Sequence, residues 1–142
     1  TKFVAGFIGS PTMNFMPAEL IASDPNGYRV RSTGIGELAL PQDAGQLNNG
    51  EPLTIGVRPE HMRLAAPAGN NCFEIVNVEY LGNEVYVYLE PKEGSTLLIH
   101  RSEAPSQWKE GQQVSLVADA DYVHLFNQSG DALPSVAQRA AA

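Results

Sequence analysis

Cysteine is nearly absent from this chain, because Cys72 is the only one among 142 residues. A single thiol excludes a disulfide within the chain, and it fits either a reducing compartment or a protein that uses few cysteines. Charged residues are also scarce, at 18% of the sequence against 43% hydrophobic residues. This composition is typical of a folded, water-soluble domain and not of a disordered chain. The length suits one ordinary domain or two very small ones.

Long hydrophobic runs are missing as well. No apolar segment approaches the roughly 20 residues that a bilayer-spanning helix needs. The first residues show no basic and then apolar leader. We therefore expect neither a secretion signal in this sequence nor direct insertion into a membrane.

Basic residues are too few for a nucleic-acid partner. Lys and Arg total 9 against 16 Asp and Glu, which gives a net charge of −7. Lys2, Lys92 and Lys109 are far apart in the sequence, and Arg29 and Arg31 form the only close basic pair. Because nucleic-acid interfaces depend on a basic face, we expect no nucleic acid among the partners.

Recognisable catalytic motifs are absent. The sequence has neither a phosphate-binding loop, GxxxxGK followed by Ser or Thr, nor a GxSxG nucleophile elbow. The histidines His61, His100 and His124 lie in three different segments, and Cys72 stands alone, so a zinc site has little support. We expect no catalytic residue, no metal and no cofactor within this chain.

Short apolar runs separated by turns rich in Gly, Pro and Asn cover most of the chain. Nine of them are typical of β-strands, at residues 15–22, 28–32, 37–40, 53–58, 72–81, 85–90, 96–100, 114–118 and 122–126. Their spacing of roughly 8–12 residues predicts an all-β barrel or sandwich. Pro17 predicts an edge strand or a bulge in the first run. In the fifth run Phe73 and Ile75 are out of phase with Val76 and Val78, which predicts a second bulge.

The opening residues have the pattern of a helix end. Phe3, Val4, Phe7 and Ile8 form one apolar stripe, and Gly9-Ser10-Pro11 is a typical helix stop. We expect this helix to continue from an upstream segment of a longer protein. A short amphipathic turn is the alternative.

The segment with the sequence GVRPEH is the first candidate site. The apolar residues of 53–57 alternate as in a half-buried strand, and Pro59, which has no N–H, ends the pairing of that strand. A cation, an anion and an imidazole follow one another closely at the strand end, on Arg58, Glu60 and His61. This grouping favours a docking surface, whereas a local turn in which Arg and Glu pair is the alternative.

Two further segments are candidate sites. One is the predicted hairpin turn with Gly82, Asn83 and Glu84, and the other is the closing strand with His124 and Phe126. For both, the alternative is a purely structural turn or strand.

Four segments, in this order, resemble the C-terminal regulatory domain of the ATP-binding subunits of carbohydrate-type ABC importers. They are FVAGFIGSP with the MNF that follows it, GVRPEH, LGNE and HLF, and together they extend over nearly the whole chain. The chain is similar to this domain of the maltose and sn-glycerol-3-phosphate importer ATPases. The resemblance implies an OB-like, or TOBE, β-barrel arrangement in two intertwined parts.

The resemblance also implies an organisation of the chain. Residues 1–12 would end a connector helix from a nucleotide-binding domain, 13–58 would form a first OB-like segment, 59–133 a TOBE-like segment, and 134–142 a flexible tail. The nucleotide-binding domain of the parent would hold ATP and Mg.

Partners follow from the same resemblance. It implies a homodimer of ATPase subunits at the cytoplasmic face of the membrane, in contact with permease subunits and, in some members, with an inhibitory regulator protein. The interface or regulatory residues would be Arg58, Pro59, Glu60, His61, Gly82, Asn83, Glu84, His124 and Phe126. The contacts to the nucleotide-binding domain would be Phe3, Phe7 and Ile8.

Two other functions remain open. A small-ligand sensor for an oxyanion or a sugar phosphate would need backbone N–H groups, or Arg29, Arg31 and Arg58, to converge. An OB-type nucleic-acid binder would stack bases on Tyr86 and Tyr88, but the acidic balance of the chain opposes it.

Overall fold

The computed structural model describes residues 13–24, 27–32, 35–40, 47–69, 72–91 and 97–133. The predicted helix over 1–9, with Phe3, Phe7 and Ile8, and the predicted tail over 134–142 lie outside these ranges. The division of the chain near residue 58 stays a prediction.

Ten strands and two short 3₁₀ turns make up the described chain. In order they are β1 (Asn14–Asp24), β2 (Gly27–Ser32), β3 (Gly36–Leu40), β4 (Pro52–Val57), η1 (Pro59–His61), β5 (Met62–Ala65), β6 (Cys72–Leu81), β7 (Glu84–Pro91), β8 (Leu98–Glu103), β9 (Gln113–Ala118), η2 (Ala120–Tyr122) and β10 (Val123–Phe126).

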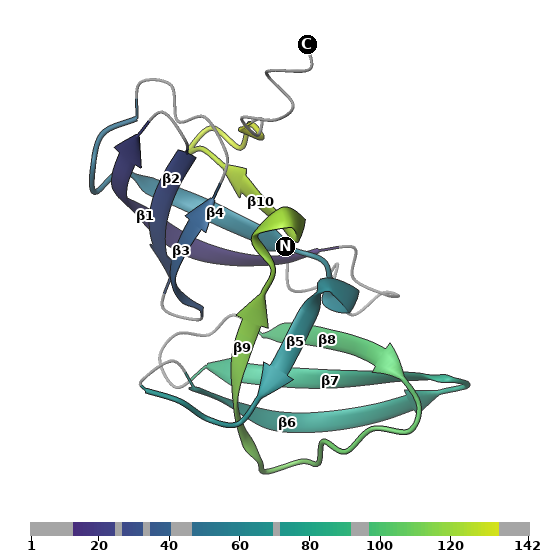
Figure 1. The fold of residues 1–142 in the computed structure, drawn as a ribbon. Helices are drawn as coiled ribbons and strands as arrows, with labels where there is room; N and C mark the ends of the chain where they lie inside the picture. Colours follow the sequence, from purple (N-terminus) through teal and green to yellow (C-terminus); the bar gives the residue numbers. More distant parts are fainter. Residues whose placement is uncertain are drawn as a thin grey trace.

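The strands form two five-stranded antiparallel sheets, with the orders β10-β4-β1-β2-β3 and β5-β9-β6-β7-β8. The chain builds four strands of the first sheet, crosses through η1 to build the second, and returns through η2 to add β10 to the first. Figure 1 shows the two sheets one above the other, joined where the two 3₁₀ turns lie. The prediction of an all-β, OB-like fold in two intertwined parts is confirmed.

The second half of the chain repeats the architecture of the first. The elements β1-β2-β3-β4-η1-β5 and β6-β7-β8-β9-η2-β10 follow the same sequence and take matching places in the sheets. The later elements are displaced by 61 residues, from Pro52 to Gln113 at the starts of β4 and β9 and from Met62 to Val123 at the starts of β5 and β10. Each half gives its last strand to the sheet of the other half.

A β-bulge occurs at the same place in both halves. The pairing of β6 with β7 shifts between Ile75 and Asn77, which confirms the predicted bulge. The pairing of β1 with β2 shifts between Leu20 and Ala22. Pro17 therefore does not mark the bulge in β1, nor is β1 an edge strand, because it lies between β4 and β2. Pro17 has no N–H to donate to a neighbouring strand. It is tolerated because β1 pairs there with β4 alone and meets β2 only from residue 18 onward.

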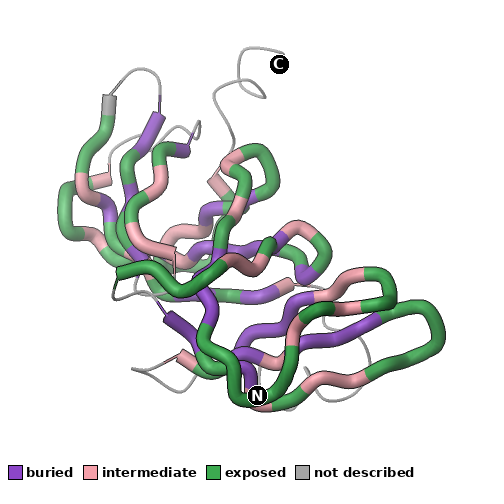
Figure 2. The backbone as a smooth tube through the Cα atoms, turned by 60° about the horizontal axis from the view of Figure 1, so that its bottom comes forward, coloured by how far each residue is buried: buried purple, intermediate pink, exposed green. Residues whose placement is uncertain are grey.

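One hydrophobic core receives side chains from both sheets, including Leu20, Val30, Ile55, Val87 and Leu125. Side chains alternate as expected for half-buried strands: in β2 the residues at 28, 30 and 32 are buried, and those at 29 and 31 are exposed. Figure 2 shows buried and exposed residues alternating along the strands, and exposed residues in many of the turns.

The predicted strands differ from the observed ones mainly around the crossovers. The strand β5 was not predicted, because its four residues are too short for a clear alternation. Arg58 and Tyr122 were placed in strands, but Arg58 precedes η1 and Tyr122 ends η2. Both belong to the crossovers between the sheets.

Candidate functional site at the junction of the two sheets

The GVRPEH segment forms the first crossover between the sheets. Pro59 is buried in the first turn of η1, and the His61 N–H donates to the Arg58 carbonyl at 2.9 Å. Its counterpart is η2, where the Tyr122 N–H donates to the Asp119 carbonyl at 2.9 Å. Both turns are short 3₁₀ pieces that change the direction of the chain between strands.

The two crossovers run antiparallel beside each other. Val57 pairs with Val123 in the first sheet, and Met62 pairs with Ala118 in the second. The residues 58–61 and 119–122 between these pairs are equal in number, so the register passes unchanged from one sheet to the other. The junction thus consists of two crossovers of equal length, each with a 3₁₀ turn, between paired strands at both ends.

His61 and Tyr122 hold the crossovers together. They occupy equivalent places in the two halves, and their rings stack with centroids 4.1 Å apart at an angle of 25°. Stacked rings of this kind contribute beyond the area they bury. The Nδ1 atom of His61 is buried and has no hydrogen-bond partner among the described residues.

Glu60 is engaged by an arginine that the sequence analysis did not select. Arg101, on β8, lies 3.4 Å from the Glu60 carboxylate, with both side chains about one-third exposed. Burial opposes the charged form of Arg101, but the charges of Glu60 and Glu84 and a hydrogen bond with Tyr86 raise its pKa above the ordinary value. Arg101 therefore pairs with Glu60, and the charge of a second predicted site residue, Glu84, also acts on it.

The turn between β6 and β7 holds the second predicted site. Gly82 has a φ of +63°, a conformation that favours glycine. The Asn83 carbonyl accepts from the Ala104 N–H at 2.7 Å, and the Glu84 carboxylate accepts from the Tyr86 hydroxyl at 3.0 Å. These bonds fix the turn, and the neighbouring Leu81 is 52% exposed at its edge.

The third predicted site lies on the first sheet. His124 is exposed opposite Gly56, and Phe126 packs against Phe15 with ring centroids 5.8 Å apart at 65°. A Cβ added at Gly56 would lie 2.5 Å from Met13 Sδ and 2.9 Å from Phe126 Cε2. We call Met13, Phe15, Gly56 and Phe126 the outer patch. The glycine in GVRPEH lets these side chains lie flat on β4.

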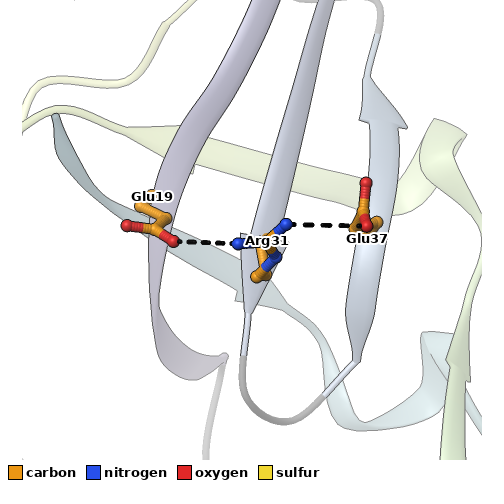
Figure 3. Close-up of polar contacts among 3 residues, drawn as sticks. All are labelled: Glu19, Arg31 and Glu37. Atoms are coloured by element: carbon orange, nitrogen blue, oxygen red, sulfur yellow. Dashed lines mark hydrogen bonds and ion pairs between the residues drawn. The ribbon is translucent and has the colours of Figure 1, made fainter. Parts of the chain in front are cut away.

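Arg31 sits between two carboxylates on the exposed face of the first sheet. Its guanidinium lies 3.5 Å from Glu19 on β1 and 3.8 Å from Glu37 on β3 (Figure 3). All three side chains are about half exposed, so these pairs contribute little to stability. They do, however, reduce the positive charge that Arg31 would offer to an anion.

The two alternating tyrosines of β7 also face carboxylates. The Tyr88 hydroxyl donates to Glu79 at 3.3 Å, and the Tyr86 hydroxyl donates to Glu84. Burial, together with the charge and hydrogen bond of Glu79, raises the pKa of Tyr88. Acidic neighbours of this kind are unfavourable for stacking nucleic-acid bases, whose backbone is anionic.

Metal-ligating side chains do not gather in the described part of the chain, where no group of three or more His, Cys, Asp or Glu residues could hold an ion. Over the same residues, no helix is long and apolar enough to cross a membrane.

The sequence model of the TOBE domain family matches residues 55–126, which include both crossovers, and the model of the MalK OB fold domain matches residues 9–62. The chain belongs to the TOBE domain family. The two matches meet at η1, so the junction of this TOBE domain is also the place where the two family descriptions overlap.

Curated relatives of this TOBE domain are import ATP-binding proteins. It is 33% identical over 133 residues to the maltose/maltodextrin import ATP-binding protein MalK of Vibrio vulnificus, and 36% identical over 135 residues to that of Mannheimia succiniciproducens. Each match includes 92% of the chain and 36% of the relative. The chain thus spans about a third of the length of the curated relatives it matches.

Among solved structures, the fold is similar to that of ModG, a cytoplasmic molybdate-binding protein crystallised with molybdate bound. The TM-score is 0.60 with 18% identity, over 79% of this chain and 94% of ModG. This likeness supports the fold of the TOBE domain and no more.

Proposed function

We propose that this TOBE domain is the non-catalytic regulatory and dimerisation domain of the ATP-hydrolysing subunit of an ABC importer for sugars or sn-glycerol-3-phosphate. The observation that carries the proposal is the match of 92% of the chain to MalK proteins, with the two family models in tandem. In this proposal ATP and Mg are bound elsewhere in the parent protein, which works at the cytoplasmic face of the membrane.

The proposed interface centres on the first crossover. Arg58 is exposed beside η1, and Glu60 forms an ion pair with Arg101 at the surface. Charged groups at an interface contribute more to specificity and register than to affinity. We assign Arg58 and Glu60 to contacts with the second subunit of a homodimer or with the nucleotide-binding domain of the same subunit.

The other proposed partners meet other parts of the surface. Permease subunits belong to the full importer, and an inhibitory regulator protein would use the exposed side chains near Gly82–Glu84 or those near His124. We also assign a protein contact to the outer patch, in which Phe15 is 37% exposed.

Sedimentation velocity of the purified chain tests the interface. We expect a concentration-dependent dimer, and we expect Arg58→Ala and Glu60→Ala to shift it toward monomer. Arg31→Ala, an exposed arginine on the first sheet, is the matched control and leaves the dimer unchanged. Equal association of all four proteins would remove the interface role. Turnover of ATP by the purified chain would contradict a non-catalytic domain.

A second candidate is a small-ligand sensor for an oxyanion or a sugar phosphate. The likeness to the molybdate-binding protein ModG favours it, although at 18% identity this likeness shows a shared fold and no shared ligand. The pairing of Arg31 with two carboxylates weighs against it. Calorimetry with molybdate, phosphate and glycerol phosphate separates the candidates, since heat of binding at micromolar ligand would favour the sensor.

A further inference from the structure

Three consecutive residues of β8 each contact a different part of the chain. Ile99 is bonded to the start of β1, His100 to the start of β5, and Arg101 to η1. We call Ile99, His100 and Arg101 the β8 clasp. The contacts lie where β8, an edge strand of the second sheet, meets the junction.

Asn14 takes the place of a neighbouring strand at Ile99. Its Oδ1 accepts from the Ile99 N–H at 2.8 Å, and its Nδ2 donates to the Ile99 carbonyl at 2.8 Å. One side-chain amide thus satisfies both backbone groups of a buried residue, as a paired strand would. The same Nδ2 lies 3.1 Å from Met62 Sδ, so Asn14 contacts both β8 and β5.

His100 makes the second contact. Its Nδ1 lies 2.8 Å from the Met62 carbonyl, which only accepts, so Nδ1 carries the hydrogen and the imidazole donates. Its side chain faces the core with Val87, the residue it pairs with on β7. His100 is only 7% exposed.

The β8 clasp lies where β5 and β8 approach each other without backbone pairing, a contact that we call the seam. The second sheet begins with β5 and ends with β8, and these two edge strands approach each other without pairing among the described residues. Among the described residues, the side chains of Asn14, His100 and Arg101 make hydrogen bonds and an ion pair that join these strands and η1. A side-chain contact opens at lower cost than a strand ladder, which must lose several backbone bonds together.

The equivalent position in the described part of the first half has no polar side chain. In the first half, a row of paired core residues just before the bulge of β1 consists of Leu20, Val30 and Leu38. In the second half, the matching row just before the bulge of β6 consists of Ile75, Leu89 and Leu98. Position 38 therefore corresponds to position 98, and position 40 to position 100. Leu40, at 2% exposure, stands where the second half has a histidine. Burying an imidazole in place of an alkyl side chain is unfavourable unless it is hydrogen-bonded. The polar seam is therefore a special feature of the second half.

We propose that the β8 clasp is a conformational joint: the seam between β8 and the β5–η1 segment opens as one unit while both sheets stay folded. Asn14 carries this opening to the start of β1, directly after residues 1–12. A partner that contacts Glu60 or the Gly82–Glu84 turn would act on the seam through Arg101, and the start of β1 would respond. The joint is a property of this chain alone, so its test is separate from the proposed importer function.

Native-state hydrogen exchange in low urea tests the joint. The Ile99 N–H is bonded to Asn14 across the seam and reports on one end. The His61 N–H closes η1, the turn that the Arg101–Glu60 pair joins to β8, and reports on the other end. In the unmodified chain we expect both to exchange at rates that hardly change with urea, at least tenfold faster than the ladder amides of β2 and β7. Exchange of all these amides at one urea-sensitive rate would show that the seam opens only by global unfolding, and would overturn the proposal.

The Arg101→Gln variant tests whether the two ends open together. We expect exchange of the Ile99 and His61 amides to accelerate by the same factor, about two- to fivefold, as loss of a partly exposed ion pair allows. Arg31→Gln, the control, changes neither rate. Acceleration at His61 without acceleration at Ile99, or no change at either, would contradict a joint that moves as one unit.

Discussion

Replacing Asn14 by alanine removes the side chain that joins the two sheets at β8. Both hydrogen bonds to Ile99, each 2.8 Å long, are lost, and the N–H and C=O of a residue only 6% exposed are left without a partner. An unsatisfied buried group costs about 1–3 kcal/mol, so the two together predict a loss of about 2–6 kcal/mol. A domain of this size has a total stability of about 5–15 kcal/mol, so the loss is a large share of it.

Urea unfolding followed by circular dichroism measures this loss as a lower midpoint at an unchanged slope. Asn14→Asp is the sharper companion variant, because it keeps the acceptor for the Ile99 N–H but loses the donor and buries a charge. We expect it to cost at least as much as alanine. The exposed Arg31→Ala should cost less than about 1 kcal/mol. If Asn14→Ala stayed within about 0.5 kcal/mol of the unmodified chain, the two sheets would not depend on this contact for their stability.

Three further changes have expected outcomes. Burial lowers the pKa of His100, against the smaller opposing effect of its bond to Met62. The unfolded chain therefore binds a proton near pH 6.5 while the folded chain does not, so stability is full above that pH and falls as the pH drops toward the folded pKa. Urea midpoints at pH 7.5 and 5.5 should differ less in His100→Leu, and an equal difference would contradict this origin. Gly56→Ala should cost about 1–3 kcal/mol through overpacking, and part should return in a Met13→Ala background, as thermal unfolding would show. Arg101→Gln should cost less than about 1 kcal/mol, and a larger loss in urea would mean that the pair is more than a surface contact.

Much of the fold was predictable because local patterns were consistent with it. The alternation in β2 and β7 and the turns at Gly27 and Gly82 mark hairpins without any knowledge of the rest of the chain. Phe73 and Ile75 are out of phase with Val76 and Val78, which predicted the bulge of β6 that the structure has between Ile75 and Asn77. A bulge in the first run was one of the two alternatives predicted from Pro17, but it lies between Leu20 and Ala22 and not at the proline.

The exchange of strands between sheets was not readable from the residues alone. Nothing local distinguishes β10 paired with β4 from β10 paired with β9, because both neighbours present the same alternation. The available signal was the 61-residue repeat, in which His61 and Tyr122 take equivalent places. Comparing the two halves residue by residue would have suggested that their crossovers meet.

The candidate site was predicted in part. Arg58–His61 was selected as a surface group at a strand end, and the structure shows it as the first crossover. Arg101 was missed because its partner Glu60 is 41 residues away, and Asn14 because its bonds to Ile99 span 85 residues. Contacts at such distances depend on tertiary structure, which no local pattern encodes.

A chimera of MalK from Vibrio vulnificus, with this chain in place of the segment that it matches, tests the proposed function most directly. Maltose uptake is measured in cells that lack their own MalK, beside a truncated MalK without that segment. We expect the chimera to restore uptake and the truncated protein to leave it absent. A chimera that accumulates and hydrolyses ATP but imports no maltose would contradict it, as would full uptake with the truncated protein.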